Sequence, residues 1–186
     1  MSGMSVWDAV RTKRAVREFA DRPIPDEDLD RIVRAGTRAH SSKNQQRWAF
    51  IVIRDRERLR ALSETGRFAG HLAGAAAAVA LVTPDPLGPG QPLSVVWDSG
   101  NAAAQMMLVA WELGIGSCPA TVYEHDAAKA ILGYPDGMDC EYILSFGYPA
   151  DPTKLTQPLK AGGRKPLDEV RFEERWGERG SSARAD

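Results

Sequence analysis

Two segments decide the fold and the site expected of this chain: KRAVREF at residues 13–19 and SSKNQQRWAF at residues 41–50. The first gathers Lys13, Arg14 and Arg17 at the end of an expected helix over residues 6–14. The second begins with hydroxyl and amide side chains and runs into an apolar strand at 48–53, expected to be buried on both faces. Cations beside neutral donors and acceptors suit a phosphorylated aromatic molecule.

Each segment has a plainer interpretation when it is taken alone. Cations at the end of a helix complement the negative C-terminal dipole without binding any ligand. Ser41, Ser42 and Asn44 are typical turn residues ahead of a strand. Taken singly, these plainer interpretations are favoured, so the argument for a binding site depends on what accompanies the two segments.

Composition indicates one domain and excludes several classes of protein. The chain has 186 residues, 43% of them apolar, with a formal charge of −1, which disfavours nucleic acid and anionic membranes as partners. Its longest apolar run, 72–82, is shorter than the roughly 20 residues of a membrane span. Cys118 and Cys140 have no CxxC spacing, so we expect reduced packing cysteines and no metal site. A cytoplasmic location is expected.

The order of predicted elements is helices first, then strands alternating with helices, which indicates an α+β or α/β fold. A helix over 26–39 has an acidic first turn, and Asp55 is placed to cap the helix after the first strand. The other expected elements are strands at 75–82, 117–123 and 140–148 and helices at 94–113 and 126–132. The helix at 94–113 is apolar on nearly all sides, which predicts burial all round and a place at a two-fold interface.

The C-terminal part of the chain changes in character. Residues 1–150 are expected to form the domain, and the proline- and glycine-rich stretch 84–92 is a candidate lid. Residues 151–177 are too interrupted for a domain and too long for a loop, which suggests an arm lying on a partner subunit. Residues 178–186 are expected to be a disordered tail.

Standard catalytic motifs are missing from the sequence. GIGSCP at residues 114–119 has proline where a dinucleotide-binding loop needs its third glycine, and it follows a helix. There is no G-x-S-x-G elbow and no phosphate-binding P-loop. Rossmann-type binding, serine hydrolysis and nucleotide hydrolysis therefore have no support.

The two segments resemble the R-R-S-x-R-x-F and P-S-S-x-N-x-Q-P-W-x-F signatures of FMN-dependent nitroreductases. Residues 98–117 also resemble a long helix of that family, and RKPLDEV at 164–170 resembles its R-K-P-L-x-E-V tail. The four matches occur in family order and span Lys13 to Val170. This joint order, and not any single motif, carries the resemblance.

The resemblance implies a three-layer α+β sandwich with a mixed central sheet, assembled as an intertwined homodimer with FMN at the interface. The arm 151–177 would wrap the partner and complete the phosphate site. The implied cofactor-binding residues are Lys13, Arg14, Arg17, His40, Ser41, Ser42, Asn44, Ala120, Thr121, Arg164 and Lys165. Those at 40–44 would come from the partner, and Ala120 and Thr121 would border the flavin through their peptides.

Several positions depart from the family pattern. Ala15 replaces a serine whose hydroxyl would bind phosphate, and Gly162 replaces a basic residue near Arg164. His40 and Arg47 stand where the family has prolines. A histidine beside the flavin could bind an anionic substrate or a nicotinamide phosphate, while a plain surface histidine is an equal alternative.

The implied activity is an NAD(P)H oxidoreductase that reduces nitroaromatics, quinones or similar small-molecule acceptors by ping-pong hydride transfer, with the chemistry supplied by the flavin. Arg17 would stabilise negative charge at the flavin N1 edge. The alternative is a flavin-binding carrier, sensor or cofactor-processing protein of the same fold without this turnover. A flavin-consuming or dehalogenating relative is a third, weaker interpretation.

Overall fold

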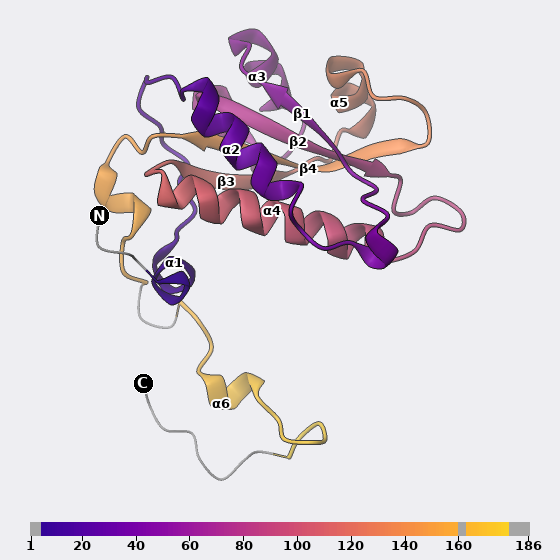
Figure 1. The fold of residues 1–186 in the computed structure, drawn as a ribbon. Coiled ribbons are helices and arrows are strands. Elements are labelled where there is room, and N and C mark those ends of the chain that lie inside the picture. The colour runs from indigo at the N-terminus through magenta and orange to yellow at the C-terminus, as the bar shows by residue number, and fades with distance from the viewer. Residues whose placement is uncertain (1–4, 160–162, 179–186) are drawn as a thin grey trace. The chain divides into compact units, whose positions relative to one another are not determined.

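The structure, a computed structural model, describes residues 5–159 and 163–178 (Figure 1). The chain divides into two units, residues 1–156 and 157–186, which are described separately. In the second unit, α6 (Leu167–Val170) is one helical turn, and Phe172 and Trp176 pack ring to ring at 4.5 Å. Most of the expected tail, residues 179–186, lies outside the described residues.

One four-stranded sheet organises the first unit, in the order β1-β2-β4-β3. The strands are β1 (Ala49–Ile53), β2 (Ala77–Pro84), β3 (Gly116–Thr121) and β4 (Met138–Gly147). All three strand pairs are antiparallel. Among the described residues, the parallel component expected of a mixed sheet is an isolated bridge between Ala15 and Ser117.

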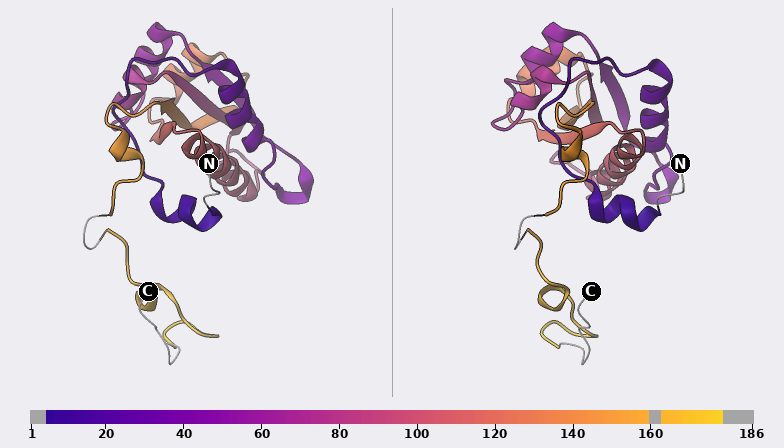
Figure 2. Two further views of the ribbon diagram at one scale, coloured as in Figure 1. Left: turned by 60° about the vertical axis from the view of Figure 1, so that its left-hand side comes forward. Right: turned by 90° about the vertical axis from the view of Figure 1, so that its left-hand side faces the viewer.

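Helices cover both faces of this sheet, as the three-layer prediction requires (Figures 1 and 2). One face packs against α2 (Asp26–Gly36) and α4 (Ser94–Glu112). The other packs against α3 (Arg56–Leu62), α5 (His125–Leu132) and the short helix η2 (Gly70–Gly74). Asp55 caps α3 by accepting a hydrogen bond from the Arg58 N–H, as predicted.

The strand β2 lies inside the sheet, between β1 and β4, and is formed by an unbroken apolar run. Ala77, Val79 and Leu81 face the α2 and α4 layer. Ala78, Ala80 and Val82 face the α3 and α5 layer. Because successive side chains of a strand point to opposite faces, a strand covered on both sides must be apolar at every position.

The first strand corrects one prediction. It was expected to be buried on both faces, but β1 lies at one edge of the sheet, with β2 as its one neighbour among the described residues. The Val52 side chain is 43% exposed. An apolar run of strand length does not distinguish an edge from a centre, because pairing partners are decided elsewhere in the chain.

The long helix α4 corrects another. Its buried residues are Val95, Asp98, Ala102, Met106, Ala110 and Trp111, which form one stripe against the sheet and α2. Val96 and Trp97 are 49% and 72% exposed in the single chain, so α4 is not buried all round. Close packing on α2 depends on Gly36, where an added Cβ would lie 2.1 Å from Cε of Met106.

The first helix is shorter than expected. α1 runs from Val6 to Thr12 after a capping box between Ser5 and Asp8, and Lys13 is its C-cap. The chain then continues in extended form, with bridges from Ala15 to Ser117 and from Phe19 to Pro149. The helix therefore does not continue to Arg14, because residues 15–19 pair with the sheet instead.

Candidate functional site

The cationic segment lies along the edge of the sheet beside β3. The Val16 N–H donates to the Ser117 carbonyl at 3.1 Å, and the Val16 side chain is 3% exposed. Side chains alternate in an extended segment, so Lys13 and Arg17 lie on the side opposite Val16. The helix expected over residues 6–14 would not have reached Arg17, and α1 ends at Thr12. In an extended chain, residues that are four positions apart point to the same side, so Lys13 and Arg17 are expected to face the same way.

Lys13 and Arg17 lack a carboxylate partner among residues 5–159 and 163–178. Within the described ranges, neither residue forms an ion pair. Burial lowers the pKa of Lys13, and the neighbouring Arg14 charge lowers it further, while Cys118 acts in the opposite direction. A half-buried ammonium without a counter-charge is electrostatically unfavourable, and an anion bound here would relieve that cost.

Arg14 has a different environment. Its Nη1 donates to the carbonyls of Arg11 and Lys13, at 2.9 and 2.8 Å, and so caps the C-terminal end of α1. Arg17 instead lines a hollow of about 260 Å³ together with Asp151 and Lys154. Of the three cations in the segment, Lys13 and Arg17 are thus the better placed to meet a ligand.

The strand β3 presents a backbone edge next to the cationic segment. The Val122 N–H donates to Glu141 on β4, whereas the Ser117 carbonyl accepts from Val16 on the other side. Because backbone groups of an antiparallel strand alternate in direction, the N–H of Thr121 points to the same outer edge as the Ser117 carbonyl. Ala120 is buried in the core under α3 and α5.

Residues 41–46, called the serine loop below, form a compact turn around the short helix η1 (Ser42–Asn44). His40, Ser42 and Asn44 are exposed, and Ser41 is half-buried. The Ser42 N–H donates to Oδ2 of Asp98, near the start of α4, at 3.0 Å. Figure 1 shows the loop beside the N-terminal part of α4.

The cationic segment and the serine loop do not meet within one chain. The serine loop is bonded to α4 at Asp98, whereas the cationic segment pairs with Ser117, which follows the C-terminal end of α4. At 1.5 Å per residue, the stretch of α4 between Asp98 and Glu112 spans roughly 20 Å. A single ligand contacting both groups would have to receive them from two chains.

Arg164 and Lys165 belong to the second unit and are not placed relative to Lys13. In that unit, Arg164 Nη1 donates to the Gly163 carbonyl at 2.7 Å. Both side chains are exposed. Their predicted contribution to a phosphate site remains a prediction.

The sequence did not predict a polar cluster that lies at the far end of β3 and β4 from the contact between Val16 and Ser117. His125, Asp139 and Glu141 hold their nitrogen and carboxylate atoms within 4.8 Å of one another. His125 Nδ1 is 2.9 Å from Asp139, which also accepts from the Tyr134 hydroxyl at 3.2 Å. Only the alternation of Asp139 and Glu141 on one strand face hinted at it, since His125 lies 14 residues away in the chain.

A second missed group lies behind the cationic segment. His71 Nδ1 is 2.8 Å from the Ser145 hydroxyl, which donates to the Cys118 carbonyl at 3.1 Å. Burial lowers the pKa of His71, and the Arg17 charge lowers it further. Both effects favour the neutral imidazole, and His71 contacts β3 through the Ser145 hydroxyl that bonds to the Cys118 carbonyl.

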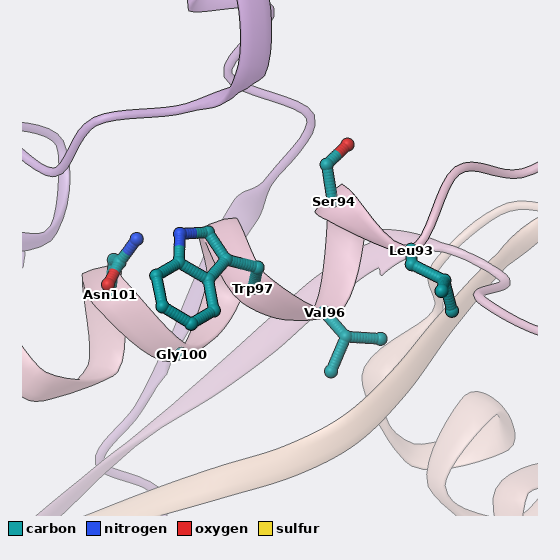
Figure 3. Close-up of a pocket in the computed structure, with 6 residues that line it drawn as sticks. All are labelled: Leu93, Ser94, Val96, Trp97, Gly100 and Asn101. Atoms are coloured by element: carbon teal, nitrogen blue, oxygen red, sulfur yellow. The ribbon is translucent and has the colours of Figure 1, made fainter. Parts of the chain in front are cut away.

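Apolar side chains remain uncovered on α1 and α4. Figure 3 shows Val96 and Trp97 projecting from α4 into an open hollow of about 650 Å³. A second hollow of about 340 Å³ lies between α4 and the sheet and is lined by Met107, Pro119 and Tyr142, among others. On α1, Val6, Trp7 and Val10 are all more than half exposed. Apolar surface of this extent is typical of a protein interface.

Comparison with known proteins matches this chain to the model described as "Nitroreductase family", over residues 10–80 and 67–148. The chain belongs to the nitroreductase family. A protein of Archaeoglobus fulgidus, provisionally named an NADH dehydrogenase/NAD(P)H nitroreductase, is 38% identical over 147 residues. That alignment covers 76% of this chain and 84% of the relative.

Solved structures agree with this nitroreductase assignment. An FMN-dependent nitroreductase from Clostridium difficile is 28% identical, with a TM-score of 0.70 over 78% of this chain and 88% of the other. The NADPH:FMN oxidoreductase of Vibrio harveyi, in complex with NAD+, has a TM-score of 0.79 over 94% of this chain and 79% of its own. At 21% identity, the latter likeness concerns the fold alone. Among the described residues, no helix of this nitroreductase-family chain has the length and apolarity to cross a bilayer.

Proposed function

We propose that this nitroreductase-family protein is an FMN-dependent oxidoreductase that takes electrons from NADH or NADPH and reduces small molecules such as nitroaromatics or quinones. The names of its relatives support this class of activity. One structural observation carries the proposal: the charges of Lys13 and Arg17 both act on Cys118 of β3, and among the described residues neither cation forms an ion pair with a carboxylate. This arrangement suits an anion that is attached to a planar ring.

The residues present fit FMN in their chemistry. Its phosphate, with a charge near −2, would supply the counter-charge that Lys13 lacks, and each charged hydrogen bond contributes about 1.5 to 3 kcal/mol. The outward N–H of Thr121 can donate to a ring nitrogen along the same edge. When bound, the flavin accepts a hydride from NAD(P)H and passes electrons to the acceptor. Arg17 would then supply a positive charge to the bound flavin.

The proposal includes a homodimer. The serine loop and the cationic segment lie roughly 20 Å apart along α4 within one chain, so His40, Ser41, Ser42 and Asn44 would reach the flavin of the partner. The uncovered apolar faces of α1 and α4 supply surface for this contact. We propose that residues 151–177 wrap the partner and that Arg164 and Lys165 complete the phosphate site.

A cytoplasmic location is part of the same proposal. Cys118 and Cys140 are buried free thiols. Such cysteines are typical of a reducing compartment. The formal charge of −1 gives no general attraction to nucleic acid or anionic lipid.

Replacing Lys13 tests the proposal. In Lys13→Ala, FMN affinity is expected to fall by about 10- to 100-fold, as loss of one charged hydrogen bond requires. Affinity is read from quenching of FMN fluorescence. The matched control is Lys129→Ala, which removes a partly exposed lysine of α5 that pairs with Asp136 and should bind FMN as the wild type does.

Turnover separates the proposed enzyme from a flavin carrier or sensor. Oxidation of NADH or NADPH by the purified protein, with a nitroaromatic or quinone added, is the expected result. Tight FMN binding without such oxidation would favour the carrier. A colourless protein that does not bind added FMN would contradict both.

A further inference from the structure

The serine loop adopts a backbone that its sequence does not favour. Lys43, Asn44 and Gln46 have φ angles of 53°, 55° and 48°, in the left-handed region. Asparagine tolerates this region, but lysine and glutamine adopt it rarely because their Cβ atoms crowd the backbone. The loop therefore needs an external contact to keep this shape.

Most hydrogen bonds of the serine loop are internal. The Asn44 N–H donates to the Ser41 carbonyl at 2.9 Å, and the Gln46 N–H donates to the Ser41 hydroxyl at 2.9 Å. These bonds shape the loop but do not attach it to the rest of the protein. The bond from the Ser42 N–H to Asp98 Oδ2, 56 residues away in the sequence, does attach it.

Asp98 is unusual for a residue in the buried stripe of α4. It is 5% exposed, and the stripe around it is apolar, including Val95 and Ala102. A buried carboxylate is costly unless it is hydrogen-bonded. The helix η1 has no side-chain cap of its own from Ser41, and Asp98 serves as that cap from another element.

We propose that Asp98 is a positioning residue for the flavin site, which fixes the serine loop to α4 in the conformation that binds the cofactor of the partner subunit. This inference rests on the proposed function. Trp97, the neighbour of Asp98 on α4, points outward on the apolar face proposed as the dimer contact. Dimer contact and loop position would thus depend on the same turn of α4.

Three substitutions at one position test the proposal. Asp98→Ala and Asp98→Leu remove the acceptor for the Ser42 N–H, and leucine, which branches at Cγ as aspartate does, is an apolar side chain placed in an apolar stripe, so that variant should fold. Asp98→Asn retains an oxygen acceptor without the charge. Glu112→Ala removes a different, exposed carboxylate of α4 and is the matched control.

Two readouts are measured on the whole 186-residue chain. FMN affinity should fall by about 10- to 100-fold in Asp98→Ala and Asp98→Leu and by no more than about threefold in Asp98→Asn. Trypsin should cleave after Lys43 about tenfold faster in the first two variants, because the loop opens locally, while their melting remains cooperative. Glu112→Ala should match the wild type in both.

A folded Asp98→Leu protein with wild-type FMN affinity and an unchanged cleavage rate would overturn the proposal. Equal loss in Asp98→Asn and Asp98→Leu would also overturn it, since charge and not loop position would then matter. If the wild type itself fails to bind FMN, the proposed function is wrong, whereas cleavage after Lys43 still tests the attachment of the loop to Asp98.

Discussion

Val16 packs directly onto the backbone of Gly116, and a methyl group at Gly116 would lie 2.6 Å from Cβ of Val16. This approach is closer than two carbon atoms tolerate, so the absence of a side chain at residue 116 allows the contact. It lets the Val16 N–H reach the Ser117 carbonyl at 3.1 Å. The position of the cationic segment thus depends on a glycine 100 residues later in the sequence.

Substituting this glycine should disturb both stability and binding. In Gly116→Ala, we expect a loss of about 1 to 3 kcal/mol in the free energy of unfolding, because Val16 is buried and stiff at χ1 and cannot move aside. Urea denaturation measures the loss. Gly74→Ala is the control, since a Cβ at Gly74 meets no atom within 4 Å. Equal stability of the two variants would refute the proposed crowding.

Arg17 is expected to tune the proposed flavin. Its positive charge favours the reduced ring, so Arg17→Ala should lower the midpoint potential by about 30 mV if the interaction is near 1.4 kcal/mol. The potential is measured by spectroelectrochemistry of the FMN-loaded protein. Arg58→Ala, an exposed arginine on α3, should leave the potential unchanged. An unchanged or higher potential in Arg17→Ala would place Arg17 away from the ring.

Trp97 should be central to the proposed dimer. Its side chain is 72% exposed in the single chain, and buried tryptophans often contribute 2 kcal/mol or more at interfaces. Trp97→Glu should therefore weaken the dimer by about 30-fold or more and reduce FMN affinity with it. Analytical ultracentrifugation measures the association. Phe68→Glu changes another exposed aromatic and should stay dimeric; if both variants do so, α4 is not the interface.

The His125 and Asp139 pair should make stability depend on pH. The hydrogen bond that His125 donates to the Asp139 carboxylate raises the pKa of His125, although partial burial opposes it. A raised pKa in the folded state means that the pair stabilises the protein fully below the ordinary value near 6.5 and loses this effect as pH rises through the folded pKa. Both groups are partly exposed, so we expect about 1 kcal/mol at most.

Asp139→Asn tests this linkage. Its loss of stability, measured by urea denaturation, should be larger at pH 5.5 than at pH 9. The asparagine oxygen can still accept from Tyr134, which separates the charge effect from the loss of that bond. The same loss at both pH values would show that the ion pair contributes nothing.

Local patterns predicted most elements of the fold. Residues close in sequence account for the apolar run that forms β2, for the acidic first turn of α2 and for the cap at Asp55. The expected burial of β1 and the expected length of α1 were wrong. In both cases a distant segment decided the outcome: β1 lies at the edge of the sheet beside β2, and Ala15 and Phe19 form bridges to Ser117 and Pro149.

The candidate site, like the fold, was predicted in part from local sequence and decided in part by distant contacts. The sequence by itself determined which side chains can bind a phosphorylated ring, because charge and hydrogen-bonding capacity belong to the residue. Only the tertiary structure decided that Lys13 and Arg17 form no ion pair within the described part of the chain, that Asp98 holds Ser42, and that His125 meets Asp139. Such contacts join residues far apart in the chain, and their geometry arises from packing of the whole sheet and its helices, which no local pattern encodes.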